Sequence, residues 1–230
     1  MSLKLYVDAL SQPSRALLIF LQASNIPFTK CIVKLGAGEH LSEEFKNNIS
    51  RFQKVPVVIH GDFHLTESVA ILRYISRENA APNNLYPKDS KLQARVDEYL
   101  EWQHTNIRAN CAMYFRKKWL EPKITGEELS EKLLLPYERR MVDSLNDFEN
   151  LWLSSGAFIT GDTLTAADIW AACEIEQPRI AGYDPESERP VLSRWLNNVR
   201  KSLSPHYEEA HTLLNKLVQK STMKKASSKL

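Results

Sequence analysis

The spacing of apolar side chains changes once along the chain, near residue 80. Before that point, short apolar runs alternate with segments whose apolar residues recur every three or four positions, as in strands alternating with helices. The pattern predicts strands at 3–7, 28–33, 55–60 and 63–66, and helices at 14–24, 42–48 and 68–78. Because a strand–helix–strand unit makes its two strands parallel neighbours, the first two strands should pair in parallel.

Beyond residue 90 the strand pattern disappears and only the helical spacing continues. Helices are predicted at 90–119, 126–153, 165–180, 190–203 and 206–220. The first of these is so long that we expect it to bend or to form the spine of a bundle. The sequence therefore predicts a small α/β domain at 1–80, a linker at 81–89 rich in proline and asparagine, an all-α domain at 90–222 and a basic tail at 223–230.

Composition and charge narrow the class of protein. The 230 residues carry a net charge of +2, which argues against a nucleic-acid-binding surface. The three cysteines lie far apart, so neither a disulfide framework nor a Cys-x-x-Cys motif is expected. Without a membrane-length apolar run or a secretory signal, the sequence favours a reduced, cytoplasmic protein that contacts no membrane.

The last three residues, Ser228-Lys229-Leu230, match a peroxisomal address. A frayed basic tail is the other interpretation, and the sequence leaves both open.

A strand, a polar turn and a helix with a proline in its first turn follow one another near the start of the chain. This order puts Ser11 at the mouth of a helix, where unpaired N–H groups and the helix dipole favour an anion. A thiolate could sit there.

Pro56 falls inside a run that otherwise reads as a strand. It indicates either an edge strand or a cis bond after Val55, which would leave the Val55 backbone free to pair with an extended peptide. Further on, Glu67 and Ser68 join a strand end to a helix start. Ser68 could be an N-cap, or the pair could bind the amine and carboxylate of an amino acid.

Other polar and aromatic positions carry weaker signals. Thr165 and Asp168 form a capping box, which is a structural element. His60 and His64 flank a turn without further ligands at metal-binding spacing, so no metal site is predicted. Arg15 and Arg73 could pair with carboxylates across a subunit contact or be solvated. Trp119 or Tyr114 could face an apolar substrate.

Taken together, these features resemble glutathione transferases over essentially the whole chain, and the theta class in particular. The resemblance rests on the first strand followed by Ser-Gln-Pro-Ser-Arg at 11–15, on Val55-Pro56, on Glu67-Ser68 and on the capping box. It implies a thioredoxin-like N-terminal domain that binds glutathione as co-substrate, a helical domain that shapes the electrophile pocket, and a homodimer. The implied activity is detoxifying conjugation of glutathione to small electrophiles, with reduction of organic hydroperoxides a further possibility.

The resemblance also implies roles for residues near the reacting sulfur. Ser11 would activate the thiol, as serine does in the theta class, and Gln12 would lie beside the sulfur. Arg108 matches an arginine on the long helix that points into the active site of this family.

The remaining implied contacts hold the tripeptide. Glu67 and Ser68 would bind its γ-glutamyl end, Val55 would pair with its cysteinyl part, and His40 with Lys54 would face its glycyl carboxylate.

The sequence departs from the family at two of the predicted glutathione-binding positions. Leu41 stands where a lysine often follows the histidine, and Thr105 stands where some theta members carry an aspartate that touches the partner subunit's ligand. Two alternatives of the same fold are a non-catalytic interaction module and a thiol-disulfide oxidoreductase. The second would need a cysteine at the helix mouth, where this chain has Ser11.

Overall fold

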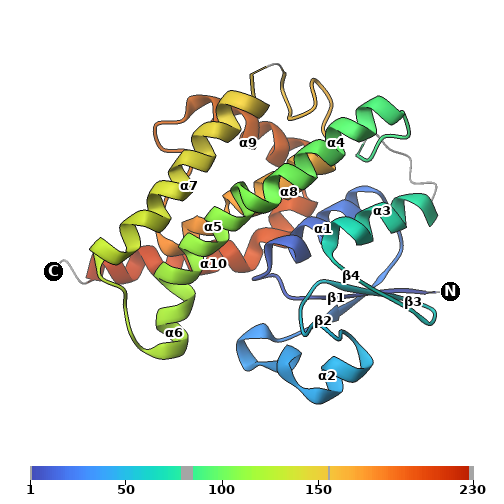
Figure 1. The fold of residues 1–230 in the computed structure, drawn as a ribbon, viewed down its shortest axis with the longest axis horizontal. Helices are drawn as coiled ribbons and strands as arrows, with labels where there is room; N and C mark the ends of the chain where they lie inside the picture. Colours follow the sequence, from blue (N-terminus) through green and yellow to red (C-terminus); the bar gives the residue numbers. More distant parts are fainter. Residues whose placement is uncertain (1, 79–84, 155, 228–230) are drawn as a thin grey trace.

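The computed structural model describes residues 2–78, 85–154 and 156–227, and it divides into a sheet with its own helices and a larger group of helices (Figure 1). The end of the predicted basic tail, residues 228–230, and the first part of the predicted linker, residues 81–84, lie outside the described residues. The domain boundaries given above stay a prediction. No helix in the described part of the chain is both long enough and apolar enough to cross a membrane.

The N-terminal elements follow the predicted order. They are β1 (Leu3–Val7), α1 (Gln12–Ala23), β2 (Thr29–Ile32), α2 (Glu43–Asn48), β3 (Val57–His60), β4 (Phe63–Thr66) and α3 (Ser68–Glu78). Two short 3-10 turns before α2 were not predicted, Leu35–Ala37 and Glu39–Leu41. Helices α1 and α3 lie on the side of the sheet that faces the C-terminal helices, and α2 lies on the other side (Figure 1).

The sheet has the strand order β2-β1-β3-β4. Strands β1 and β2 are parallel, with Lys4 opposite Thr29, which confirms the prediction for the first two strands. Strand β3 is antiparallel to both β1 and β4, so it is not an edge strand. The edge-strand interpretation of Pro56 is therefore wrong. The peptide bond between Val55 and Pro56 is cis, and both residues precede β3 rather than belong to it.

The long helix predicted at 90–119 is bent. Helix α4 (Ser90–Trp102) passes through a 3-10 turn (Gln103–Thr105) into α5 (Ile107–Phe115), then into a π-helical segment (Arg116–Leu120) and α6 (Glu121–Thr125). Asn106 leaves the helical conformation, with φ −113° and ψ −103°. Its side-chain Nδ2 donates to the carbonyl of Trp102 at 2.8 Å and so occupies an acceptor that the turn leaves free.

The remaining helices are α7 (Glu131–Trp152), α8 (Ala166–Ile175), α9 (Pro190–Leu203) and α10 (His206–Ser227), with a 3-10 turn (Gln177–Ala181) after α8. That turn replaces the predicted end of the helix at 165–180, because Pro178 cannot donate a backbone hydrogen bond. Every residue of α8 is buried, and the helix packs against α1, α4, α5 and α9. Helix α8 therefore joins the helical part of the chain to α1 of the sheet part, and α10 packs against α1 as well.

Candidate functional site

Ser11 stands at the N-cap of α1, as predicted. Its Oγ accepts a hydrogen bond from the Ser14 N–H at 3.4 Å, and the side chain is half-buried. Because this bond uses the oxygen only as an acceptor, the hydroxyl proton stays available for an anion at the helix mouth. The helix N-terminus adds a favourable dipole at the same place.

The loop that carries Ser11 is fixed by a carboxylate at its start. Asp8 Oδ1 accepts from the Leu10 N–H at 2.7 Å, and Oδ2 accepts from the Leu35 N–H at 2.9 Å. The Asp8 carbonyl also accepts from the Ser11 N–H at 3.0 Å. The backbone N–H groups of Leu10 and Ser11 are therefore already hydrogen-bonded, which fixes the loop that carries the Ser11 hydroxyl.

Arg15 fixes the same loop from behind. Its Nη1 donates to the Ala9 carbonyl at 2.8 Å, and its Nη2 donates to the Cys173 carbonyl at 2.9 Å and to Gln177 Oε1 at 2.7 Å. Gln177 Nε2 donates in turn to the Leu10 carbonyl at 3.2 Å. Arg15 is fully buried. The expectation that it is solvated or crosses a subunit contact is therefore wrong, because its partners lie within this chain.

Arg73 also has its carboxylate partners within this chain, although its side chain is 31% exposed. Its guanidinium pairs with Asp97 and Glu101 of α4, each at 2.9 Å, and so joins α3 to the helical part of the chain. Hydrogen bonds to Asp97 and Glu101 raise the pKa of Arg73 despite partial burial.

Two predicted site residues meet at a carboxylate that the sequence analysis did not single out. Arg108, near the start of α5, donates through Nη1 to Glu174 Oε1 of α8 at 2.5 Å. Glu174 is 1% exposed. Burial raises the pKa of Glu174, while Arg108 and Arg15 and a hydrogen bond from Gln12 act to lower it. A second carboxylate in a mostly apolar helix, beyond Asp168 of the capping box, was the signal that could have identified Glu174.

The junction of β4 and α3 brings Glu67 and Ser68 into distinct environments. Glu67 is exposed and has a positive φ of 65°, a left-handed conformation that costs a non-glycine residue about 1 kcal/mol or more. The Ser68 hydroxyl is buried and accepts from Trp170 Nε1 of α8 at 3.1 Å. Since Ser68 is the first residue of α3 and the Glu67 carbonyl accepts from the Ile71 N–H, the N-cap interpretation of Ser68 is wrong.

The other predicted glutathione-binding residues lie at the ends of loops. His40 and Leu41 belong to the 3-10 turn before α2, where Leu41 is exposed and the buried Nδ1 of His40 has no hydrogen-bond partner among the described residues. Lys54 is exposed and Val55 half-buried, just before β3. Thr105 is exposed at the bend between α4 and α5, and its hydroxyl accepts from Asn106. No hydrogen bond or ion pair within the described ranges joins these residues to Ser11.

An apolar cluster lies beside the Ser11 loop. Leu10, directly before Ser11, packs with the π-helical segment and α10 in a cluster built on Phe115, Ile180 and Leu214. Trp119 is half-buried in this cluster and stacks on Phe115, with ring centroids 5.3 Å apart. Tyr114 is buried instead, and its hydroxyl accepts from Lys118. Of the two aromatic residues considered for an apolar substrate, Trp119 is the one adjoining the Ser11 loop.

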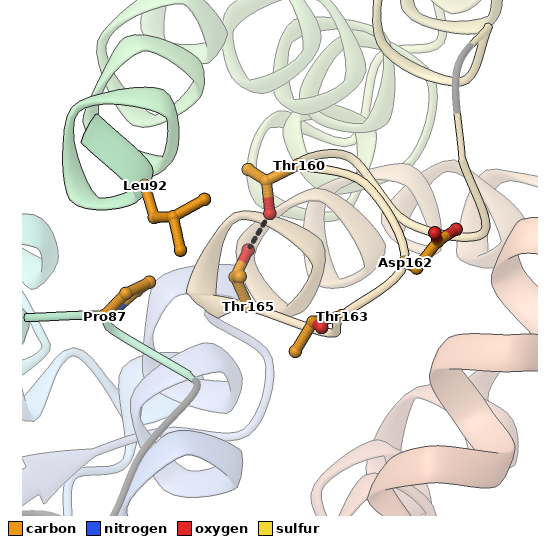
Figure 2. A pocket seen from close by; sticks show the side chains of 6 residues that line it. All are labelled: Pro87, Leu92, Thr160, Asp162, Thr163 and Thr165. Atoms are coloured by element: carbon orange, nitrogen blue, oxygen red, sulfur yellow. Dashed lines mark hydrogen bonds between the residues drawn. The ribbon is translucent and has the colours of Figure 1, made fainter. Parts of the chain in front are cut away.

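A cavity of about 310 Å³ lies away from these residues, between the start of α4 and the loop before α8 (Figure 2). Pro87, Leu92 and Asp162 line it together with three threonines, of which Thr160 donates to Thr165 at 3.4 Å. None of its lining residues belongs to the predicted site. Thr165 is the N-cap of α8 and forms the predicted capping box with Asp168, which is confirmed.

Comparisons with known proteins agree with this arrangement. The N-terminal domain model of glutathione S-transferases matches residues 1–77, and the C-terminal domain model matches residues 113–202. Glutathione S-transferase theta-1 of Bos taurus and that of Homo sapiens are each 40% identical to the chain over 217 residues, covering 94% of this chain and 90% of the relative.

Solved structures of glutathione transferases are also similar to this chain. The apo form of human glutathione-S-transferase T1-1 superposes with a TM-score of 0.90 at 39% identity, covering 95% of this chain and 91% of that one. A human theta-class glutathione transferase in complex with the glutathione conjugate of 1-menaphthyl sulfate superposes with a TM-score of 0.90 at 35% identity, covering 98% and 92%.

Proposed function

Since the chain belongs to the glutathione S-transferase family and to its theta class, we propose that it conjugates glutathione to small electrophiles and that Ser11 activates the thiol. The observation that carries this assignment is the Ser11 hydroxyl at the N-cap of α1, in a loop fixed by Asp8 and Arg15. A fixed donor aimed at a developing anion needs no reorganisation when the reaction occurs.

The chemistry is stabilisation of a thiolate. A free thiol has a pKa of about 8.5, so only a few per cent is ionised at pH 7. A hydroxyl that donates to the charged sulfur contributes about 1.5 to 3 kcal/mol, which lowers the thiol pKa by roughly one to two units. The proton passes to solvent, the thiolate forms a C–S bond with the electrophile, and the bond to the leaving group breaks.

The tripeptide would bind along the loops at the ends of the sheet. Glu67 accepts from the γ-glutamyl amine, Ser68 and its backbone N–H bind the adjoining carboxylate, and Val55 pairs through its backbone with the cysteinyl part. His40 and Lys54 face the glycyl carboxylate. The left-handed backbone of Glu67 supports this part, because such strain is retained at ligand-binding positions.

Two other predicted glutathione-binding positions contribute less in this proposal. Leu41 offers no charge to the glycyl end, and Thr105 offers a hydroxyl where some theta members have a carboxylate.

Arg108 would stabilise the anion that leaves the electrophile. One theta-class relative has been solved with the glutathione conjugate of 1-menaphthyl sulfate, and a sulfate ester releases an anion when its carbon is attacked. The guanidinium of Arg108 is one-third exposed, so its donors beyond Nη1 can reach such a group.

The proposal extends to a cytoplasmic homodimer that also reduces organic hydroperoxides. Size-exclusion chromatography with light scattering tests the dimer, and imaging of the full chain with and without its last three residues tests peroxisomal delivery.

The activity itself is tested by retention on glutathione-agarose, followed by conjugation assays with alkyl halides, epoxides, aralkyl sulfates and organic hydroperoxides. Turnover with at least one electrophile supports the proposal. Retention without turnover on any of them would instead identify a non-catalytic module that kept its binding site.

A further inference from the structure

Glu174 is a buried carboxylate in the wall between the two parts of the chain. All ten residues of α8 are buried, and Glu174 is 1% exposed among alanine, isoleucine and cysteine neighbours. Its Oε1 accepts from Arg108 Nη1, whereas Oε2 has no hydrogen bond of ordinary geometry within the described ranges. The Gln12 side chain lies close enough to lower the pKa of this carboxyl.

Stability alone does not explain such a residue. Moving a carboxylate out of water is expensive, and well-packed apolar residues often replace a buried ion pair without loss of stability. One oxygen of Glu174 lacks a regular partner, so its environment is not optimised for folding. The hydrogen bond that Glu174 does make is instead to Arg108, the arginine of α5.

We propose that Glu174 is a positioning residue that fixes Arg108 toward an anionic leaving group on the electrophile. The inference rests on the proposed function, and it adds a residue of α8 to the site. Arg108 has a long side chain, one-third exposed, that would sample many conformations without an anchor. A bond from Nη1 to a buried carboxylate restricts it and leaves the other guanidinium donors for the leaving group.

The consequence is selectivity between substrates. A sulfate ester carries its charge both when it binds and when it leaves, so it requires an oriented guanidinium throughout. A halide of the same carbon skeleton is neutral when it binds and depends on Arg108 less. Loss of the anchor should therefore reduce turnover of the sulfate far more than turnover of the halide.

The experiment compares Glu174→Gln with the unmodified enzyme on 1-menaphthyl sulfate and on 1-menaphthyl chloride. Glutamine has nearly the same shape but lacks the charge that holds Arg108. We expect kcat/KM for the sulfate to fall by roughly tenfold to a hundredfold, and kcat/KM for the chloride to change by less than about threefold. Glu98→Gln is the matched control, because it breaks an exposed pair with Arg95 on α4 and should change neither substrate.

A double-mutant cycle separates positioning from a general structural effect. In an Arg108→Ala background, Glu174→Gln should add less than about a twofold further loss, because the side chain that it anchors is gone. Arg108→Lys keeps the charge at a partly exposed position without the planar guanidinium, so it should reproduce the sulfate defect even if Glu174→Gln fails to fold.

Three results would overturn the positioning role. They are equal losses on both substrates, a full additional loss in the Arg108→Ala background, or an unchanged sulfate rate in Glu174→Gln, with Arg108→Lys taking its place if Glu174→Gln fails to fold. The unmodified enzyme is assayed first on both substrates. Absence of any turnover there overturns the proposed function, whereas turnover with no selective defect in the variants overturns only the role of Glu174.

Discussion

The guanidinium of Arg15 and the side-chain amide of Gln177 form a buried hydrogen bond of 2.7 Å that joins the first helix of the sheet part to the 3-10 turn after α8. Both side chains also bind the backbone directly before Ser11, Arg15 at Ala9 and Gln177 at Leu10. The position of the Ser11 hydroxyl therefore depends on α8 and the turn after it, whose contacting residues follow Arg15 by 158 and 162 positions.

Arg15→Met tests this dependence. Methionine fills similar space but donates no hydrogen bond, so the Ala9 and Cys173 carbonyls and Gln177 lose a buried partner. We expect unfolding free energy to fall by about 3 kcal/mol or more, since each buried group left unpaired costs about 1 to 3 kcal/mol. Urea unfolding measures it. Arg95→Met, at an exposed position, is the control and should cost less than about 0.5 kcal/mol.

Ser11→Ala removes the proposed donor to the sulfur. We expect turnover at pH 7 to fall about tenfold to a hundredfold, because the pKa of the bound thiol rises by roughly one to two units, while the dissociation constant for glutathione changes by less than about threefold. Ultraviolet absorbance of the thiolate against pH gives the pKa directly. Ser14→Ala is the control, since its buried hydroxyl has no hydrogen-bond partner in the described part of the chain. Equal turnover of Ser11→Ala and the unmodified enzyme would reject the assignment.

The backbone course of the N-terminal part could be predicted from the sequence because its signals are local. Alternating apolar runs located four strands, and a proline after Ser11 located the start of α1. The parallel pairing of the first two strands followed from the helix between them. The sequence left two interpretations of Pro56 open, an edge strand or a cis peptide bond, because both are compatible with a proline in the same apolar run.

The supports of the site could not be predicted because they depend on contacts distant in sequence. Arg15 looked like a surface charge until α8 supplied the Cys173 carbonyl and the turn after it supplied Gln177. Ser68 looked like an N-cap because it stands at a helix start. Its hydrogen-bond donor, Trp170, is 102 residues further along the sequence and could not be predicted. The sequence shows that Glu174 is a charged residue in a mostly apolar segment. It does not show that Arg108 is its partner.

Trp170→Phe tests the contact from α8 to the predicted γ-glutamyl site. Phenylalanine keeps most of the buried ring but cannot donate to Ser68, so the Ser68 hydroxyl is no longer oriented. A lost hydrogen bond of about 1 kcal/mol corresponds to roughly a fivefold rise in KM for glutathione, with kcat at saturation little changed. Trp152→Phe is the matched control, because Trp152 Nε1 has no hydrogen-bond partner within the described ranges. A similar KM for both variants would argue against an orienting role for Trp170.

Asp168→Asn tests the capping box at the start of α8. Each carboxylate oxygen of Asp168 accepts two hydrogen bonds. Oδ1 accepts from the Ile159 N–H and from Trp195 Nε1, and Oδ2 accepts from the N–H and the hydroxyl of Thr165. The amide nitrogen of an asparagine would face two of these hydrogen-bond donors and could accept from neither. We therefore expect the free energy of unfolding, measured with urea, to fall by about 3 kcal/mol. Asp162→Asn, on the exposed loop in Figure 2, should cost less than about 0.5 kcal/mol. A loss at Asp168 no larger than at Asp162 would contradict the structural role of the box.

Acid sensitivity should arise at His211 of α10. This imidazole is 1% exposed, stacks on Tyr207 with ring centroids 4.1 Å apart, and donates from Nδ1 to the Tyr207 carbonyl. Burial lowers the pKa of His211 to about 3, and Arg15 and Arg179 add to the effect while Glu176 opposes it. Because the folded pKa lies below the unfolded value of about 6.5, the unfolded chain binds the proton first as pH falls. Stability is therefore complete above about pH 6.5 and is lost as the pH drops toward 3.

Measurement between pH 7 and pH 5 isolates this residue from its neighbour Glu176. Burial opposes the ionised form of Glu176, but His211, Arg179 and Arg200 lower its pKa to about 2, so its own contribution is lost only as the pH falls below about 4.5. In the upper window we expect the unfolding free energy to fall by about 2 kcal/mol, 1.36 kcal/mol for each of about 1.5 pH units. His211→Phe keeps the stack on Tyr207 without a titrating nitrogen, so its profile should be flat to within about 0.5 kcal/mol, whereas His64→Gln, at an exposed position, should retain the slope. A slope that persists in His211→Phe would mean that another group takes up the proton when the chain unfolds.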